Sequence, residues 1–180
     1  MDKSNVLIRE VMLRDGLQNI IDFIPTEAKI ELFRLIVASG IRDAEITSFV
    51  NPKAVPQFGD ASQVAQAVLK IKPEGVRVSA LIPNLKGAQL ALKSGLRDLA
   101  FVMSVSESHN ISNVRRSTDE SVEELKKILD LRSDYPDLEV RGGMAAVFGC
   151  PFEGKIKPQV TLNFIRRFYQ LGVRDMSVAD

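Results

Sequence analysis

The feature that most constrains the fold is a short pattern that recurs along the chain. In each copy, glycine, an apolar residue, arginine and aspartate stand between a helix-like stretch and a strand-like stretch. The copies are Gly40-Ile41-Arg42-Asp43, Gly95-Leu96-Arg97-Asp98 and Gly172-Val173-Arg174-Asp175, with Gly75-Val76-Arg77-Val78 as a looser fourth. Glycine just past a helix end adopts the left-handed conformation at little steric cost. We therefore interpret the pattern as the joint between a helix and the next strand, with the Arg-Asp pair at the solvated bottom of that strand.

Signals for five helices lie between these joints. Thr26 begins a stretch in which Ile30, Phe33, Ile36 and Val37 share one helical face. Residues 60–63 and 117–120 both have the form of a capping box. Asn84 can cap a helix that ends at Gly95, and Pro158 suits the first turn of a helix that ends near Gly172.

Strands are expected between the helices, at residues 6–13, 43–48, 76–82, 98–104, 138–146 and 175–179. The strict alternation of strands and helices predicts right-handed βαβ units and a parallel sheet. No glycine-rich phosphate turn follows the first strand, and polar residues follow nearly every strand. The sequence therefore predicts an α/β fold of the TIM (β/α)₈-barrel type, with about six of the eight strands.

The length bears on how complete this barrel is. A whole barrel takes about 250 residues, whereas the chain has 180. We expect residues 1–180 to form a single, incomplete barrel domain, either the N-terminal part of a longer protein, which we favour, or a short chain that closes its sheet in another way. Alone, this stretch should be marginally stable, prone to associate through unpaired edge strands, and inactive.

Composition and charge exclude several classes of function. The chain has 24 basic and 23 acidic residues and a net charge of +1, so no basic surplus favours nucleic acid. Residues 1–5 do not begin a signal peptide, and no run approaches the roughly 18 apolar residues that a spanning helix needs. The single cysteine, Cys150, cannot form an internal disulfide. We expect a soluble, cytoplasmic protein.

The stretch Arg14-Asp15-Gly16-Leu17-Gln18 follows the first expected strand. A strand that delivers an arginine and an aspartate to its carboxyl end places a cation beside a metal ligand. Asp15 beside an arginine suits a divalent cation with an anionic oxygen substrate. The alternative is that Asp15 and Glu45, in the second strand, merely pair with Arg14. An Asp-Gly pair is also an ordinary turn dipeptide.

Polar residues after the later strands are weaker candidates. His109, the only histidine, lies in what we interpret as a long polar loop after the fourth strand, where binding groups are common. The alternative for His109 is a plain loop or core role. Arg115 and Arg116 could face phosphates, or they could form a solvated cluster at the start of a helix. Nothing around Cys150 indicates a lowered thiol pKa, so we favour a buried structural cysteine. The other polar residues near strand ends are Thr47, Ser48, Asn84, Ser104, Ser106, Glu107, Glu153 and Asp180.

Five blocks of this sequence resemble the family of 3-hydroxy-3-methylglutaryl-CoA (HMG-CoA) lyases, which belongs to the metal-dependent lyases and synthases built on a TIM barrel. The blocks are Arg14–Asn19, Glu45–Lys53, Pro56-Gln57, Pro83–Gly87 and Gly149–Ile156. They occur in order, with matching gaps, along essentially the whole chain. One such block would be weak, but five in register are specific.

The resemblance implies a carbon–carbon lyase that cleaves HMG-CoA, or a similar 3-hydroxyacyl-CoA, to acetyl-CoA and acetoacetate, as in leucine degradation. It implies that Asp15 binds a Mg²⁺ or Mn²⁺ ion, and that Arg14 and Glu45 are catalytic, Arg14 by stabilising the developing enolate. The implied substrate-binding residues are Gln18, Ser48, Asn84 and His109. The expected partners are the acyl-CoA substrate and a second copy of the chain in a homodimer, with no nucleic acid and no membrane.

Three features depart from the family pattern. The family's metal-binding His-x-His and its glycine-rich loop with a catalytic cysteine have no counterpart in residues 1–180, so Asp15 alone cannot complete a metal site. Residues 141–146 read Arg-Gly-Gly-Met-Ala-Ala where known lyases have a tyrosine and more polar residues. The Ser-His-Asn segment around His109 is more similar to other members. The alternatives are therefore a Claisen-type synthase that joins acetyl-CoA to a 2-oxo acid, and a truncated, non-catalytic remnant.

Overall fold

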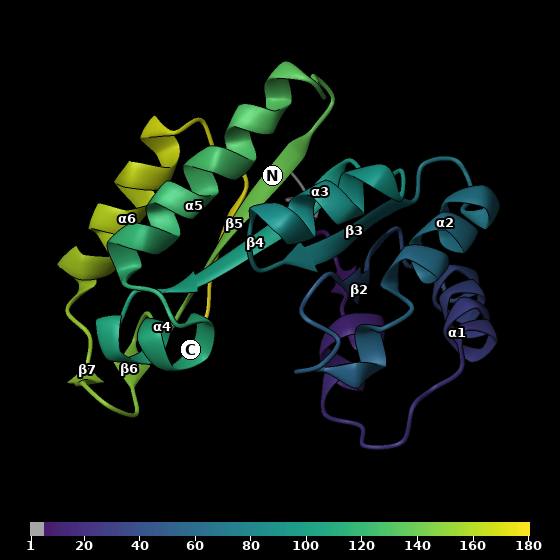
Figure 1. Cartoon of the computed structure of the whole chain (residues 1–180), viewed down its shortest axis with the longest axis horizontal. Coiled ribbons are helices and arrows are strands. Elements are labelled where there is room, and N and C mark those ends of the chain that lie inside the picture. Colours follow the sequence, from purple (N-terminus) through teal and green to yellow (C-terminus); the bar gives the residue numbers. More distant parts are fainter. Residues whose placement is uncertain (1–5) are drawn as a thin grey trace, which may run out of the picture. The chain divides into compact units, whose positions relative to one another are not determined.

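The computed structural model describes residues 6–180, which divide into two compact units. The first unit contains the residues up to 81 together with 90–96, and the second contains 82–89 and 97–180. Strands alternate with helices in both, as predicted (Figure 1). The expectation that no signal peptide begins in residues 1–5 lies outside the described residues.

The first unit is built on parallel strands. β1 (Arg9–Glu10) pairs with β2 (Asp43–Ser48), and β2 pairs with β3 (Arg77–Ile82). The intervening helices are α1 (Thr26–Ala38) and α2 (Ala61–Ile71), and α2 packs against both β2 and α1. Two short helical turns complete the unit, η1 (Met12–Gly16) and η2 (Pro56–Phe58).

The second unit also has three parallel strands. β5 (Glu139–Ala145) lies between β4 (Asp98–Ser104) and β8 (Met176–Val178), and the two-residue strands β6 (Gly149–Cys150) and β7 (Gly154–Lys155) form an antiparallel hairpin. The helices are α4 (Glu107–Val114), α5 (Thr118–Asp130) and α6 (Pro158–Gln170), with a 3₁₀ turn, η3 (Leu131–Ser133). α3 (Leu85–Lys93) contributes its first turn here and its end to the first unit. α5 and α6 lie side by side (Figure 1), joined by the ion pair of Arg167 with Asp119 at 2.7 Å.

The first expected strand, residues 6–13, is wrong in length. Only Arg9 and Glu10 are in β1, and the chain then enters the π-helical turn η1. The backbone N–H groups of Arg14 and Asp15 both donate to Val11 O, at 3.0 and 2.7 Å. The Arg-Asp pair is therefore carried by a helical turn, and not by the end of a strand.

The polar loop expected after the fourth strand is also wrong, because residues 107–114 form the helix α4. Ser106 is its N-cap, and its hydroxyl accepts from the backbone N–H of His109 at 3.2 Å. Asn110, in the middle of α4, fixes the helix by hydrogen bonds on both sides of it in the sequence. Its amide donates to Arg116 O, Ser117 O and Ser121 Oγ, and its carbonyl accepts from Ser104 N.

Two of the three predicted helix caps are confirmed. Ser117 and Glu120 make the complete capping box of α5, and the side chain of Asn84 accepts from Gly87 N at 2.9 Å at the start of α3. The capping box expected at Asp60 is wrong. Asp60 occupies the N-cap position of α2 but makes no cap bond, because its carboxylate binds Thr26 and Lys29 instead.

The helix-to-strand joints are confirmed in their backbone and corrected in their environment. Gly40, Gly95 and Gly172 have φ values of 99°, 97° and 90°, as a left-handed joint requires. The aspartates that follow are not uniformly solvated, however. Asp43 is fully buried and pairs with Arg9 at 3.1 Å, and Asp98 pairs with Arg141 at 3.0 Å. A buried carboxylate needs such a partner.

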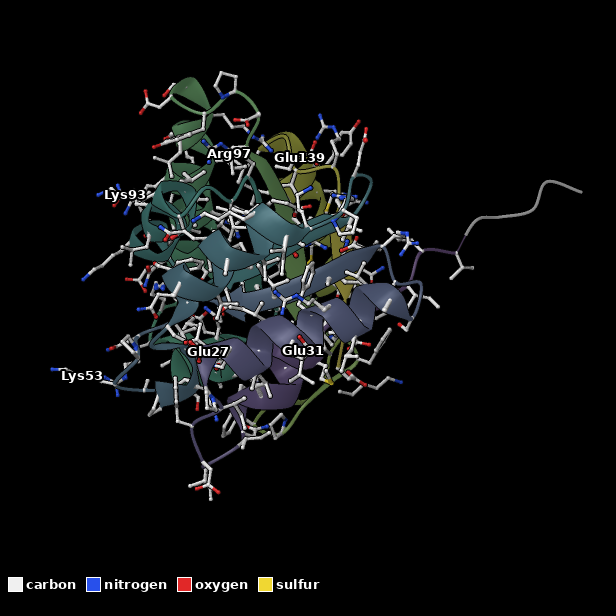
Figure 2. All side chains as sticks on the ribbon, turned by 90° about the vertical axis from the view of Figure 1, so that its right-hand side faces the viewer. Glu27, Glu31, Lys53, Lys93, Arg97 and Glu139 are labelled. Atoms are coloured by element: carbon white, nitrogen blue, oxygen red, sulfur yellow. The ribbon has the colours of Figure 1, made fainter. Side chains whose placement is uncertain are left out.

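The apolar face expected for α1 packs into the core, with Phe33 and Ile36 buried. Lys29 lies on this same face and is only 2% exposed, whereas Glu27 and Glu31 lie on the exposed side of the helix (Figure 2). The same helix therefore carries two solvated charged residues, Glu27 and Glu31, and a buried one, Lys29. The buried lysine has no counterpart among the sequence-based expectations.

The glycines of β5 allow close packing in the second unit. A Cβ at Gly142 would lie 2.4 Å from Cδ2 of Phe168, and one at Gly143 would lie 2.8 Å from Cγ2 of Val102. Phe168 of α6 is fully buried, so its ring has little room to move. Close packing against Phe168 and Val102 thus explains why glycines stand at positions 142 and 143, within the segment that departs from the family pattern.

We predict that Gly142→Ala lowers the free energy of unfolding by about 1–3 kcal/mol, the usual cost of overpacking a core. Gly149→Ala is the matched control, because a Cβ there meets nothing within 4 Å. Urea denaturation of both variants measures the difference. Equal losses would show that the contact with Phe168 does not restrict this position.

Candidate functional site

Arg14 is the centre of the candidate site in the first unit. Its Nε donates to Glu45 Oε1 in β2, and its Nη1 donates to Asp15 Oδ1 at 2.6 Å. Gln18 Nε2 donates to the same Asp15 oxygen at 3.3 Å. The structure thus brings four of the predicted residues together. The register of β2 against β3 also shifts between Glu45 and Thr47, and irregularities of this kind are common beside active sites.

The three charged side chains form a gradient of exposure. The side chain of Glu45 is 5% exposed, that of Arg14 is 20% exposed and that of Asp15 is 55% exposed. Glu45 therefore depends on Arg14 for its charge partner, whereas water can solvate Asp15. The guanidinium thus binds the buried Glu45 through Nε and the exposed Asp15 through Nη1.

The donor set fits a hard divalent cation in part. Asp15 offers an exposed carboxylate, and its bonds from Arg14 and Gln18 both go to Oδ1. Carboxylate oxygens are the ligands that Mg²⁺ and Mn²⁺ prefer. Within residues 6–180, no group of three or more His, Cys, Asp or Glu side chains is arranged to hold a metal ion. Asp15 can therefore supply one ligand of such a site, with Glu45 sequestered behind Arg14.

Two predicted substrate-binding residues have structural partners. Ser48, at the end of β2, is buried, and its hydroxyl lies 3.5 Å from Leu81 O, which is a marginal hydrogen bond. Asn84 belongs to the second unit, where its side-chain oxygen caps α3. The side-chain oxygen of Asn84 is thus already used. Among the described residues of the first unit, no hydrogen bond joins Ser48 to the Arg14 cluster.

His109 lies on α4 in the second unit. Its Nδ1 is hydrogen-bonded to the hydroxyl of Ser104, which is fully buried at the end of β4. Its ring centroid is 6.2 Å from that of Phe152. Among the described residues Nε2 has no such bond, so it is the ring nitrogen left for a ligand.

Cys150 is buried, as predicted, but its thiol is not in a neutral environment. Burial raises the pKa of the Cys150 thiol, but hydrogen bonds from the Ser106 hydroxyl at 2.9 Å and from the backbone N–H groups of Phe152 and Glu153 outweigh it and lower the pKa overall. No local sequence pattern indicates this lowered pKa. A serine one residue before Glu107 is an N-cap signal that could have revealed Ser106 as the residue at which α4 starts.

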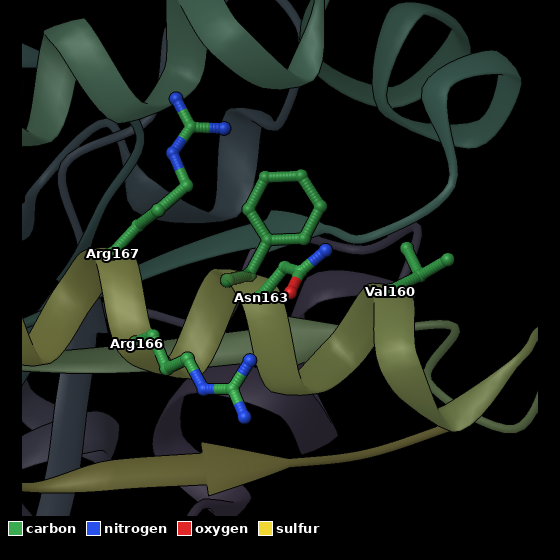
Figure 3. Close-up of a pocket in the computed structure, with 5 residues that line it drawn as sticks. Val160, Asn163, Arg166 and Arg167 are labelled. Carbon is green, nitrogen blue, oxygen red and sulfur yellow. The ribbon is translucent and has the colours of Figure 1, made fainter.

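A separate groove of about 420 Å³ lies along α6 (Figure 3). All its lining residues belong to that helix: Val160, Asn163, Phe164, Arg166 and Arg167. None of the predicted site residues lines it. In the described part of the chain, no helix is both long and apolar enough to cross a membrane.

Comparison with protein families gives a match over almost the whole chain. Residues 5–180 match the model of the family described as HMGL-like. The mitochondrial hydroxymethylglutaryl-CoA lyase of Arabidopsis thaliana is 38% identical over 97% of this chain and 37% of its own length. A hydroxymethylglutaryl-CoA lyase of Bacillus subtilis is 37% identical over 98% of this chain and 58% of its own length.

Solved structures agree with these relatives. The hydroxymethylglutaryl-CoA lyase of Pseudomonas aeruginosa superposes with a TM-score of 0.91 at 34% identity, over 97% of this chain and 57% of that one. An HMG-CoA lyase of Acinetobacter baumannii, in complex with coenzyme A and 3-methylmalate, gives 0.90 at 33% identity, over 97% and 56%. The chain thus spans 37–58% of the lengths of these proteins. The predicted fold class, a partial TIM-barrel type, and the resemblance to HMG-CoA lyases are confirmed.

Glu153 provides a test by pH. The backbone N–H of Ser108 donates to its carboxylate at 2.7 Å and lowers the pKa of Glu153. A lowered folded-state pKa adds stability above the unfolded-state value of about 4.3, and this stability is lost as the pH falls through the folded-state pKa.

We predict that Glu153→Gln reduces the loss of stability between neutral pH and about pH 3. Thermal melts across that range measure it, with Glu123→Gln on the exposed face of α5 as control; identical pH profiles for Glu153→Gln and wild type would contradict it.

Proposed function

The chain belongs to the HMGL-like family, and from that premise we propose that it acts in a carbon–carbon lyase that cleaves HMG-CoA to acetyl-CoA and acetoacetate. The observation that carries the proposal is the Arg14 guanidinium, fixed between buried Glu45 and exposed Asp15. Such a group can stabilise negative charge that develops on a thioester oxygen. Release of acetyl-CoA from HMG-CoA by the purified full-length protein is the direct test.

Arg14 is proposed as the catalytic residue. Cleavage leaves acetyl-CoA as an enolate, whose charge must be stabilised as it forms. A guanidinium such as that of Arg14 offers several N–H donors in a fixed plane. The bond to Glu45 orients that plane before the substrate arrives, so no reorganisation is needed during the reaction. Glu45 is proposed to act through Arg14, because its side chain is buried behind it.

Asp15 is proposed as a metal ligand, with Gln18 holding its carboxylate through Oδ1. A bound Mg²⁺ or Mn²⁺ ion would lower the pKa of the substrate's tertiary hydroxyl and polarise its oxygens. The exposed position of Asp15 supports this assignment, because a ligand must be reachable and must exchange one partner for another. Substrate binding by Ser48, Asn84 and His109 stays a prediction.

The acyl-CoA substrate rests on the relatives. The A. baumannii lyase was solved with coenzyme A, which supports a coenzyme A thioester as the ligand proposed here. The named relatives are lyases, which favours cleavage over the synthase alternative. Some are named mitochondrial and others cytoplasmic, as in Mus musculus, so a cytoplasmic location, leucine degradation and a homodimer remain predictions.

We predict that activity needs a divalent metal and that Asp15→Asn lowers kcat/KM about 100-fold or more, the scale of losing a group that stabilises transition-state charge. The free energy of unfolding should fall by less than about 1 kcal/mol, because an exposed ion pair adds little. Asp134→Asn, at an exposed position after η3, is the control. Full activity after exhaustive chelation would refute the prediction.

We predict that Arg14→Lys lowers kcat about 10²–10³-fold while KM changes little, because lysine keeps the charge but cannot reach Glu45 and a second oxygen together. Steady-state kinetics with HMG-CoA measure both constants. Arg34→Lys on the exposed face of α1 should leave both unchanged. A raised KM with near-normal kcat would assign Arg14 to binding alone.

A further inference from the structure

Lys29 and Asp60 form a buried ion pair that the proposed chemistry does not use. Lys29 Nζ lies 2.7 Å from Asp60 Oδ1, and the two side chains are 3% and 6% exposed. Withdrawing two charges from water is costly, and such a pair often adds no stability over well-packed apolar residues. Its presence therefore calls for a reason other than stability.

Both charges also bind groups around the loop that follows the Arg14 segment. Lys29 Nζ donates to the backbone oxygen of Gln57 and lies 4.4 Å from the centre of the Phe23 ring. Asp60 Oδ2 accepts from Thr26 Oγ1 at 2.8 Å, which ties the start of α1 to the start of α2. The pair thus fixes Gln57 between two helices.

The Gln57 side chain holds the loop itself. It is 2% exposed, and its amide nitrogen donates to the backbone oxygens of Ile20, at 3.1 Å, and Asp22. Its amide oxygen accepts from Ile24 N at 3.2 Å. One side chain therefore satisfies three backbone groups at alternate positions of residues 20–24, and the pattern of two acceptors and one donor fixes the orientation of its amide.

This loop is continuous with the turn that carries the site. Ile20 N donates to Leu17 O at 3.0 Å, so the held loop begins where the helical residues after η1 end. On the other side, Leu13 and Leu17 are buried and anchor the turn in the core. The segment that bears Arg14, Asp15 and Gln18 is therefore fixed at its base by apolar burial and at its exit by Gln57.

We propose that Gln57, held by the Lys29–Asp60 pair, is a positioning residue for Arg14 and Asp15. The proposal rests on the proposed lyase function for its kinetic consequence, but not for its structural one. Without the three bonds, residues 20–24 expose their backbone groups to water and the exit of the turn moves. A displacement of about 1 Å at a reacting group can cost about 100-fold in rate.

The test is Gln57→Met in the full-length protein, which keeps the length of the side chain and removes all three bonds. We expect amide hydrogen exchange at Ile24, and at the η1 amides of Arg14–Gly16, to rise at least about tenfold. We expect kcat to fall about 10–100-fold, with KM changed less than about threefold. Thr26→Val, which removes only the hydroxyl that holds Asp60, should show the same pattern in weaker form and covers the case in which Gln57→Met does not fold.

Phe33→Leu is the matched control, because it weakens the core under the same helix and keeps the three hydrogen bonds of the Gln57 side chain. At an equal loss of Tm it should leave exchange at Arg14–Gly16 and kcat unchanged within about twofold. An equal fall of kcat in Phe33→Leu, or unchanged exchange at η1 in Gln57→Met, overturns the proposal. If the wild-type protein releases no acetyl-CoA from HMG-CoA, the proposed function fails. The positioning role of Gln57 is then tested by amide hydrogen exchange at η1 alone.

Discussion

Pairing of buried carboxylates is the constraint on which the first unit depends. Asp43, Glu45 and Asp60 are each at most 6% exposed, and each has a cation as partner, respectively Arg9, Arg14 and Lys29. An unpaired buried charge would cost several kcal/mol. The first pair therefore supports the register of β1 against β2, the second places the candidate catalytic arginine, and the third holds the loop beyond it.

The second unit has the Asp98–Arg141 ion pair and adds a network of neutral hydrogen bonds. Asn110 is fully buried and makes four bonds that join β4, α4 and α5, and Ser106 connects the N-terminus of α4 to the Cys150 thiol. Such a network needs every member to be satisfied in a medium of low dielectric constant. It explains why a segment of polar residues forms a helix here, where no apolar face indicates one.

The contrast between these residues shows how far the sequence predicts the structure. Glycine joints, apolar helical faces and the box at Ser117 depend on neighbours in the chain, so the α-helices other than α4 and the parallel strands, apart from the length of β1, are predicted. The grouping of Arg14, Asp15, Gln18 and Glu45 was predicted as well, from their places near strand ends. The partners of Asp60 and the bond of Ser106 to Cys150 depend on residues far apart in the chain, and local patterns are silent about them. Lys29 is intermediate, because its spacing from Phe33 and Ile36 places it on the buried face, although no local signal names Asp60 as its partner.

Exposure also decides which carboxylate at Arg14 is suited to bind a metal ion. Glu45 cannot lose its partner, because its side chain is buried and a lone charge there costs several kcal/mol. Asp15 is 55% exposed, and a pair at such a position contributes only about 0–1 kcal/mol. Exchanging Arg14 for a cation is therefore cheap at Asp15 and costly at Glu45. Arg14 can thus stay bound to Glu45 while Asp15 exchanges Arg14 for a metal ion. A group that stabilises an enolate beside a metal ligand needs this arrangement.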